Sequence, residues 1–263
     1  MVANVDIHHS AIIEDGAEIG DGTSVGPFCF VGSKVRLGQN VELKSHVVIK
    51  GDTFLGDENT VFPFAVLGEI PQDKKFNGES TSLKIGNRNQ IREHVTINVG
   101  TKGGGGITKV GNDGLFMAGC HIAHDAQVGD NVILVNNASL AGHCIIEDNV
   151  IVGGLSGVHQ FVRIGEGAII GAVTMVTNDV IPYGLVQAPR GELDGLNLVG
   201  LKRKGVPRAD IMALRAAFQT LSQGDGTFQD RAQKLTDDSD SKYVEKIVSF
   251  VLGHSDRSFL TPR

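Results

Sequence analysis

A large apolar residue recurs at every sixth position along most of the chain. The series runs without a break from Ile7 to Leu67, continues in the same phase from Ile85 to Ile97, and resumes after a one-residue shift from Val110 to Val176. The position two residues earlier is usually small or β-branched, as in Ala17, Thr23, Cys29, Val35, Val47, Ala126, Val132, Ala138, Cys144, Ser156 and Ala168. Residues two apart point to the same face of a strand. The pattern therefore predicts many short strands, each with one apolar face.

Glycine directly follows many of these apolar residues, and Asp or Asn often comes next. The glycines are Gly20, Gly26, Gly32, Gly38, Gly56, Gly86, Gly111, Gly129, Gly153, Gly165 and Gly171. Because Gly, Asp and Asn tolerate positive φ, we expect a tight corner after each strand. A six-residue unit cannot bury its apolar face alone, and stacked units place their strands about 4.8 Å apart. The sequence thus predicts a mainly β fold, a parallel β-helix.

This periodicity resembles that of the hexapeptide-repeat transferases. The resemblance implies three hexads in each coil and a left-handed parallel β-helix, although left-handed crossovers are rare in other folds.

Two polar, glycine-rich segments interrupt the repeat at residues 68–84 and 98–109. We expect long loops there, and long loops on a rigid repeat scaffold often bind ligands. The glycine run at 103–106 lacks the Lys-Ser/Thr pair and the strand-to-helix context of a phosphate-binding loop, so we expect a flexible hairpin.

The repeat is expected to stop at Pro182, because proline cannot donate to a strand ladder. Helical patterns follow: one begins near Pro207, one spans Thr227 to about Leu235, and one spans Ser239 to about Leu252. We predict a β-helix domain over residues 1–189, and a connector with a small α-helical domain over 190–263. These helices are expected to cover the open edge at the end of the coil.

Composition excludes several classes of protein. The chain has 263 residues with 35 Gly and 7 Pro, and 41% of its residues are hydrophobic. Without a Gly-X-Y period it is not collagen, and it is too apolar for a disordered linker. The net charge of −6 argues against extensive nucleic-acid binding.

The three cysteines, Cys29, Cys120 and Cys144, all occupy the small inward position. Their odd number and spacing argue against a disulfide framework or a zinc finger, so we expect small core residues rather than catalytic thiols. The chain contains neither an apolar stretch of about 18 residues nor a signal-peptide pattern, so we expect no membrane span and a cytoplasmic protein.

His121, His124, His143 and His159 lie within a short part of the repeat. With three hexads per coil, His143 and Gln160 fall close to one and two coils after His124, so we expect them to line one outward-facing edge. The first interpretation is that each of these histidines is an ordinary solvated surface residue, which would be sufficient for any one of them taken alone. The second interpretation is a zinc site like that of the carbonic anhydrases of this fold, although HIAH departs from their His-x4-His spacing. Acid–base catalysis by imidazole is the third interpretation.

The chain is similar to UDP-N-acetylglucosamine acyltransferases, which catalyse the first step of lipid A synthesis. The segments that carry the similarity are GEIPQDKKF, HVTIN, HIAHD, NNASLAGH, GGLSGVHQF, NDVIPYGL and LNLVGLKRKG, and they span essentially the whole chain. The resemblance implies transfer of an (R)-3-hydroxyacyl group from acyl carrier protein to the glucosamine 3-position of UDP-N-acetylglucosamine, without a metal or other cofactor.

The resemblance also implies roles for individual residues. His124 would be the general base, Asp125 would orient it, and the Gly142 N–H would stabilise the thioester oxyanion. The sugar and diphosphate would be held by Asp73, Lys75, His121, His143 and Gln160. The nucleotide or the pantetheine would be reached by Asn197 and Arg203.

The family further implies a homotrimer and an acidic carrier-protein partner. A basic patch formed by Lys202, Arg203, Lys204 and Arg208 fits that partner, although it could also be solvated surface. Ala172 occupies the position where the family sets acyl-chain length, and its β-carbon would shorten the preferred chain relative to glycine.

This chain departs from the family pattern at Asn98, Ala188-Pro189-Arg190 and Val199. Asn98 leaves open whether the acceptor atom is a 3-hydroxyl or a 3-amino group. The N-acyltransferase of the same pathway is less favoured, because it carries a separate N-terminal domain whereas the hexads here begin at Ile7. A zinc carbonic anhydrase and a purely structural solenoid are the remaining alternatives.

Overall fold

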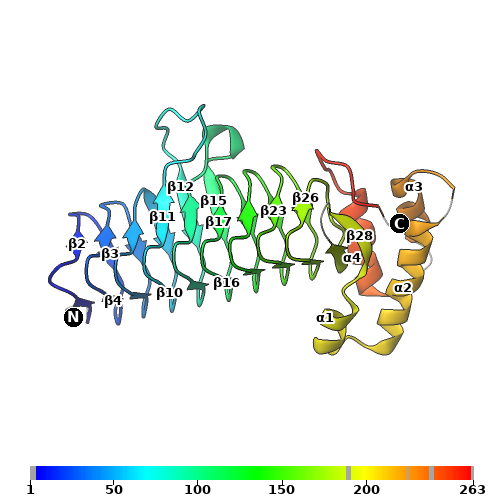
Figure 1. The fold of residues 1–263 in the computed structure, drawn as a ribbon, viewed down its shortest axis with the longest axis horizontal. Helices are drawn as coiled ribbons and strands as arrows, with labels where there is room; N and C mark the ends of the chain where they lie inside the picture. Colours follow the sequence, from blue (N-terminus) through cyan, green and yellow to red (C-terminus); the bar gives the residue numbers. More distant parts are fainter. Residues whose placement is uncertain (1–3, 188–190, 224, 237–239, 262–263) are drawn as a thin grey trace.

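The computed structural model describes residues 4–187, 191–223, 225–236 and 240–261, and shows a three-sided coil of short strands (Figure 1). Sheet A contains β1 (Asp6–Ile7), β4 (Ser24–Val25), β7 (Glu42–Leu43), β10 (Thr60–Val61), β13 (Gln90–Ile91), β16 (Leu115–Phe116), β19 (Ile133–Leu134), β22 (Ile151–Val152), β25 (Ile169–Ile170), β27 (Gly184–Gln187) and β28 (Glu192–Leu196). Sheet B contains β2 (Ile12–Ile13), β5 (Phe30–Val31), β8 (Val48–Ile49), β11 (Val66–Glu69), β14 (Thr96–Asn98), β17 (His121–Ile122), β20 (Ser139–Leu140), β23 (Gly157–Val158) and β26 (Met175–Val176). Sheet C contains β3 (Glu18–Ile19), β6 (Arg36–Leu37), β9 (Asp52–Leu55), β12 (Ser82–Ile85), β15 (Ile107–Val110), β18 (Gln127–Val128), β21 (Ile145–Ile146) and β24 (Arg163–Ile164).

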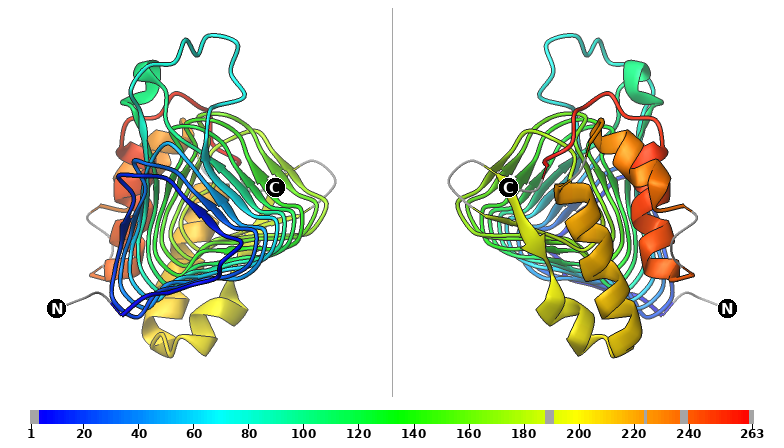
Figure 2. Two further views of the ribbon diagram at one scale, coloured as in Figure 1. Left: turned by 90° about the vertical axis from the view of Figure 1, so that its left-hand side faces the viewer. Right: turned by 90° about the vertical axis from the view of Figure 1, so that its right-hand side faces the viewer.

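Each strand pairs in parallel with the equivalent strand of the next coil. Ser24 of β4 lies opposite Glu42 of β7, and its N–H donates to the carbonyl oxygen of Val41 at 2.8 Å. Three strands make one coil, and Figure 2 shows the resulting triangular cross-section. The parallel β-helix with three hexads per coil is therefore confirmed.

The apolar series fills the inside of the coil. Val31, Ile49, Leu67 and Ile97 of sheet B are all fully buried. The three cysteines are free and buried as expected, and burial raises the pKa of the Cys144 thiol to about 12. A thiol with such a pKa is not a nucleophile near neutral pH, so its role is packing.

The glycines that follow the apolar residues are not needed for positive φ. Positive φ occurs two residues later, for example at Asn40 (53°) after Gly38 and at Glu58 (56°) after Gly56. A Cβ on Gly26 would lie 2.1 Å from the carbonyl oxygen of Lys44 in the next coil. Glycine is required at Gly26 because the next coil approaches too closely there for a side chain.

Both insertions leave the coil at the corner between sheets B and C and project together from it (Figure 1). The first connects β11 to β12 and the second connects β14 to β15, so each is shorter than predicted because its ends are strands. The second contains a 3-10 helix, η1 (Lys102–Gly104). The carbonyl oxygen of Thr101 accepts hydrogen bonds from the N–H groups of Gly104 and Gly106. The expectation of a flexible glycine hairpin is therefore wrong, since this segment is hydrogen-bonded.

The coil continues for one strand beyond Pro182, the predicted end of the repeat. Pro182 lies in a turn between Val180, which bridges to Ile164, and β27, in which Leu185 pairs with Ile169. A turn position needs no ladder N–H, so proline is tolerated there. The prediction was wrong because it assumed that Pro182 would fall in a strand. Strand β28 then pairs antiparallel with β27.

The C-terminal part is helical and lies against the end of the coil (Figures 1 and 2). The three predicted helices are present as α2 (Arg208–Ser222), α3 (Phe228–Lys234) and α4 (Lys242–Leu252). A fourth helix, α1 (Leu198–Arg203), was not predicted, and it begins where the side chain of Asn197 accepts a hydrogen bond from the Gly200 N–H. Among the helices that the structure describes, none has the length and apolar character needed to cross a bilayer.

The predicted boundary between residues 189 and 190 and the Ala188-Pro189-Arg190 departure lie outside the described residues, as does Ser239, the predicted start of the last helix. The division into two domains stays a prediction.

A buried ion pair joins the C-terminal part to the coil. Arg163 of β24 donates from Nε to Oδ2 of Asp179 at 2.7 Å, and the Arg163 backbone N–H donates to Oδ1 at 2.8 Å. Ser255, beyond α4, donates to the same carboxylate at 2.6 Å. The side chain of Asp179 is fully buried, so loss of the carboxylate leaves the Arg163 charge unpaired in the interior.

We expect Asp179→Ala to lower the free energy of unfolding by about 3 kcal/mol, the cost of breaking a buried pair from one side. Thermal and urea unfolding would measure the change. Asp15→Ala is the control, because Asp15 is exposed. Equal stability of the two variants would show that this ion pair does not join the helices to the coil.

Candidate active site

The candidate site lies at the corner between sheets B and C, where both insertions leave the coil. His124 and Asp125 lie between β17 and β18, and His143 lies between β20 and β21, one coil further on. The backbone of Asp125 (φ 60°) and of His143 (φ 62°) is left-handed. This corner conformation turns the side chains away from the apolar interior and places them side by side.

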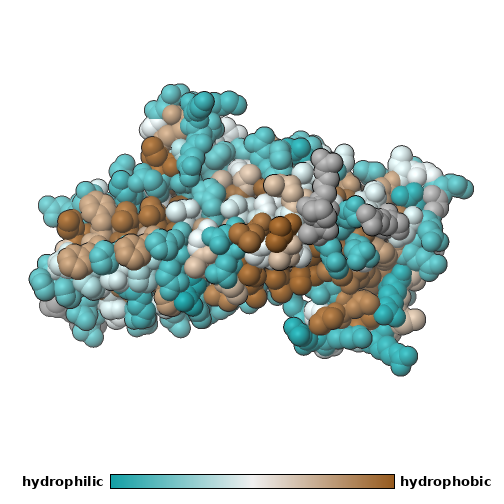
Figure 3. Space-filling model, in the orientation of Figure 1, coloured by the Kyte–Doolittle hydropathy of each residue, from teal (hydrophilic) through white to brown (hydrophobic). Residues whose placement is uncertain are grey.

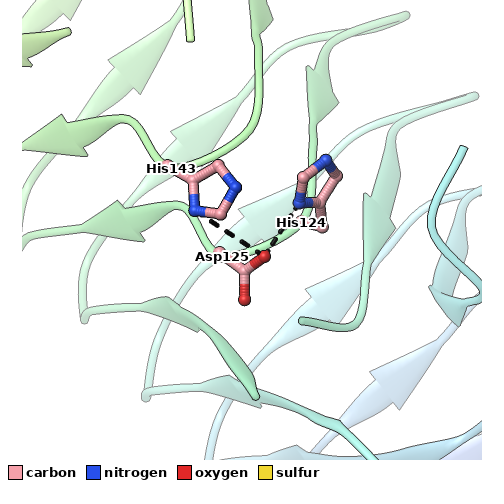
Figure 4. Close-up of side chains that lie close together, drawn as sticks. All are labelled: His124, Asp125 and His143. Carbon is pink, nitrogen blue, oxygen red and sulfur yellow. Dashed lines mark hydrogen bonds and ion pairs between the residues drawn. The ribbon is translucent and has the colours of Figure 1, made fainter. Parts of the chain in front are cut away.

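His124, Asp125 and His143 form a compact group (Figure 4). Nδ1 of His124 lies 2.8 Å from Oδ2 of Asp125, whose side chain is fully buried. The ionised carboxylate can only accept, so Nδ1 carries the proton and Nε2 is left as an acceptor. His143 lies further off, with Nδ1 3.8 Å from the same oxygen. The pair of His124 and Asp125 is thus arranged as a general base with an orienting carboxylate.

Gly142 lies directly against the His124 ring in the next coil. A Cβ at this position would be 2.6 Å from Cε1 and 2.7 Å from Nε2 of His124, so only glycine leaves room for the imidazole. None of the backbone carbonyls in the described chain accepts a hydrogen bond from the Gly142 N–H. This donor therefore remains available next to the basic nitrogen.

The second insertion holds Asp125 in place. Thr101 donates from its backbone N–H to Oδ1 at 2.8 Å and from its hydroxyl to Oδ2 at 2.6 Å. The hydroxyl of Thr108 accepts from the Asp125 N–H at 2.8 Å. These contacts could not be predicted from the sequence, because a threonine in a glycine-rich loop has no distinctive pattern.

Two hollows lie on either side of the corner. One, of about 500 Å³, runs over the outer face of sheet B and is lined by Gln72, Asn98, His121, His124, Ser139, Gly142, Gly157, His159 and Met175, among others. The other, of about 920 Å³, lies below the insertions and is lined by Asp73, Lys75, Phe76, Glu79, Thr101, His143 and Phe161, among others. The structure therefore places His121 in the same hollow as His124, and Asp73, Lys75 and His143 together in the other hollow.

Asn98 is nearly fully buried beside the sheet B hollow. Its Nδ2 donates to the carbonyl oxygens of Glu69 and Ile70 at 3.3 and 3.1 Å. Its Oδ1 has no hydrogen-bond partner in the described structure. A buried acceptor without a partner is costly, so this oxygen is suited to a donor group on a ligand.

Two histidines near His124 have lowered pKa values because they are buried. Burial lowers the pKa of His121, and the neighbouring His124 lowers it further. Burial also lowers the pKa of His143, although the Asp125 carboxylate acts in the opposite direction. In the unfolded chain these two histidines have ordinary pKa values of about 6.5, so they take up protons at a higher pH than in the folded chain. The free energy of unfolding therefore has its full value above about pH 6.5. It decreases as the pH falls from there through the lowered pKa values of His121 and His143 in the folded chain.

Gln160 is exposed at the same corner, between β23 and β24. The other predicted residues lie elsewhere in the single chain. Asn197 caps α1 and donates to the carbonyl oxygen of Gly167 at 2.9 Å, which places it at the corner between sheets C and A. Arg203, Lys202, Lys204 and Arg208 follow in α1 and at the start of α2. Ala172 is exposed at the corner between sheets A and B.

Met175 was missed as a candidate. It lies on the outer face of sheet B, and its Cε and Sδ approach Gly157 so closely that a Cβ there would lie 3.3 and 3.4 Å away. It therefore bounds the sheet B hollow on the side away from His121.

A cation could in principle use the same group, because His124, Asp125 and His143 each place one ligand atom within 4.8 Å of the others. The three-histidine set expected of a zinc site is not formed by them. Nδ1 of His124 and both oxygens of Asp125 already hydrogen-bond within the protein. The expectation of a metal-free site stays a prediction.

Comparison with known proteins places this site in a family. Residues 179–260 match the family model described as Udp N-acetylglucosamine O-acyltransferase, Domain 2, and residues 16–51 match bacterial transferase hexapeptide (six repeats). An acyl-(acyl-carrier-protein)–UDP-N-acetylglucosamine O-acyltransferase from Paracoccus denitrificans is 66% identical over 202 residues, which are 77% of this chain and 77% of that protein. The chain belongs to the UDP-N-acetylglucosamine O-acyltransferase family.

The rest of the comparison supports this assignment along the whole chain. The O-acyltransferase of the same name from Agrobacterium fabrum is 43% identical and covers 100% of this chain and 97% of its own. A UDP-N-acetylglucosamine acyltransferase structure from Campylobacter jejuni matches with a TM-score of 0.92 and 39% identity over 98% of this chain and 100% of its own. The predicted family, its left-handed β-helix and its enzymatic character are thereby confirmed.

Proposed function

We propose that this acyltransferase moves an (R)-3-hydroxyacyl chain from acyl carrier protein to the glucosamine 3-position of UDP-N-acetylglucosamine, the first step of lipid A synthesis. The observation that carries the proposal is the His124–Asp125 pair with its free Nε2 beside the unpaired N–H of Gly142. A base and an oxyanion donor at one point are what acyl transfer from a thioester requires.

In this mechanism, Nε2 of His124 takes the proton from the acceptor as its oxygen attacks the thioester carbonyl. The carbonyl oxygen becomes an oxyanion and receives a hydrogen bond from the Gly142 N–H. The C–S bond then breaks, and the imidazolium returns the proton to the departing thiolate. Asp125 stays ionised and stabilises the imidazolium.

The two hollows provide places for the two substrates. Asp73, Lys75 and His143 border the larger hollow, which suits the polar sugar and diphosphate together with Gln160. The hollow over sheet B has an apolar floor and is closed by Met175, which suits the acyl chain. Met175 and Ala172 then limit the length of that chain.

The unpaired Oδ1 of Asn98 concerns the identity of the acceptor atom, a 3-hydroxyl oxygen or a 3-amino nitrogen. It lines the same hollow as His124 and His121, and it can accept a hydrogen bond from either a hydroxyl or an amino group. We take the 3-hydroxyl as the acceptor, in accordance with the O-acyltransferase family, and keep the 3-amino sugar as the alternative.

We also propose a homotrimer. Apolar side chains are exposed at equivalent positions along the corner between sheets A and B: Phe28 (61%), Phe64 (50%), Leu155 (66%) and Val173 (60%). All have positive φ, which is unfavourable for such residues, and Figure 3 shows apolar surface along the coil. A neighbouring copy of the chain would cover this corner.

A neighbouring copy would also complete the site. Within one chain, Asn197 is held at the corner between sheets C and A by its bond to Gly167, away from His124. In a trimer, Asn197 and Arg203 of the adjacent copy can face the B/C corner and bind the nucleotide or pantetheine. The basic patch of Lys202, Arg203, Lys204 and Arg208 would meet the acidic carrier protein in the cytoplasm.

His124→Ala is expected to lower acyl transfer by about two to four orders of magnitude, because the general base is lost. Transfer from defined acyl-carrier-protein thioesters to UDP-N-acetylglucosamine and to its 3-amino analogue measures this loss and identifies the acceptor atom.

His254→Ala is the matched control, because that side chain is 91% exposed, and it should retain the full rate. Wild-type activity in His124→Ala would refute the mechanism. A rate abolished by a chelator and restored by zinc would favour the metal alternative instead.

Val173→Asp is expected to dissociate the trimer, because it places a charge in an apolar interface. Sedimentation equilibrium would measure the mass against three times the chain mass of 27.9 kDa. Asn131→Asp is the control, since Asn131 has a similar φ of 55° at the corner between sheets C and A. An unaltered mass of Val173→Asp would show that the subunits meet elsewhere.

A further inference from the structure

The glycine-rich insertion has a relation to the site that neither its sequence nor the family match indicates. Asp125 is fully buried and adopts positive φ, so both its charge and its backbone need support from the surroundings. That support comes from Thr101 in the insertion and from Thr108 in β15, the strand that follows it.

The first end of the insertion fixes the carboxylate. Thr101 uses its backbone N–H for Oδ1 and its hydroxyl for Oδ2. Oδ2 also accepts from His124, so the Thr101 hydroxyl and the imidazole share one oxygen. The two hydrogen bonds from Thr101 fix the orientation of the Asp125 carboxylate. The hydrogen bond that His124 donates to this carboxylate then fixes the orientation of the imidazole ring.

Strand β15, which follows the insertion, fixes the backbone. The hydroxyl of Thr108 accepts from the Asp125 N–H at 2.8 Å, and Thr108 is fully buried. Thr101 and Thr108 therefore hold Asp125 from its side chain and from its main chain. The hydrogen bonds of Gly104 and Gly106 to the Thr101 carbonyl oxygen close the loop between them.

The glycines let the loop come close enough to do this. A Cβ on Gly104 would lie 2.1 Å from Cγ of Asp125, and a Cβ on Gly100 would lie 2.8 Å from its Oδ1. A Cβ on Gly103, next in sequence to Gly104, would meet nothing within 4 Å. Gly104 is therefore needed for its close approach to the carboxylate, whereas Gly105 and Gly106 are needed for their positive φ of 93° and 80°.

We infer that the insertion is a clamp in which Thr101 is a positioning residue, holding Asp125 and through it the His124 base. This inference rests on the proposed function of His124. The clamp acts on the orientation of the base rather than on substrate binding, so its loss should lower kcat and leave KM unchanged.

The first test compares Thr101→Val with Thr101→Ser. Valine keeps the shape and the backbone N–H but removes the hydroxyl, so kcat should fall by about tenfold or more, with KM for both substrates within about twofold. Serine keeps the hydroxyl and should restore kcat to near the wild-type value. A merely structural threonine would not give this pattern at an unchanged melting temperature.

The second test uses two glycines as a matched pair. Gly104→Ala pushes a methyl group into the Asp125 carboxylate and should lower kcat at least as much as Thr101→Val. Gly195→Ala, in β28, adds the same methyl group where nothing lies within 4 Å and should keep the wild-type kcat. In an Asp125→Ala background, Thr101→Val should have no further effect, because no carboxylate remains to be held.

The outcomes separate the clamp from the function. An inactive His124→Ala together with wild-type kcat in Thr101→Val and Gly104→Ala would overturn the clamp and leave the function intact. An equal loss from Thr101→Val with and without Asp125 would also overturn the clamp. Full activity in His124→Ala would overturn both the function and the clamp.

Discussion

The hydrogen-bond ladder between successive coils is the constraint on which the rest of the molecule depends. The N–H groups of the strands in one coil must meet carbonyls of the next coil at a fixed spacing, so the strands of every coil repeat the same path. The close contacts at Gly26 and Gly38 follow from this spacing, as does the stacking of Val31, Ile49 and Leu67 in the core. A side chain at the wrong corner position would separate the strands on both sides.

The same constraint decides where chemistry can occur. The interior is apolar, and extra residues can leave the coil only at a corner without breaking the ladder. Both insertions leave at the corner between sheets B and C, which already carries His124, Asp125 and His143. The coil on one side and the hydrogen-bonded loop on the other hold His124 and Asp125 in position, and the corner between sheets A and B carries exposed apolar side chains.

The six-residue period was sufficient to predict the coil and the buried cysteines, and apolar residues at helical spacing were sufficient to predict the three main helices, because each feature follows from a local pattern. Features that depend on contacts between distant segments could not be predicted. The contact of Gly104 with Asp125 joins two coils, and the unpaired oxygen of Asn98 depends on how the first insertion folds over it. Pro182 was misjudged because its position in a turn is set by the coil rather than by its neighbours in sequence.

A crystal structure with the acylated sugar nucleotide bound would test most directly whether catalysis occurs at the corner between sheets B and C. We expect the 3-position oxygen within about 3 Å of Nε2 of His124, and the ester carbonyl oxygen at a similar distance from the Gly142 N–H. The nucleotide should reach Asn197 and Arg203 of an adjacent copy. A product bound with its 3-position away from His124, or wholly within one chain, would contradict this assignment.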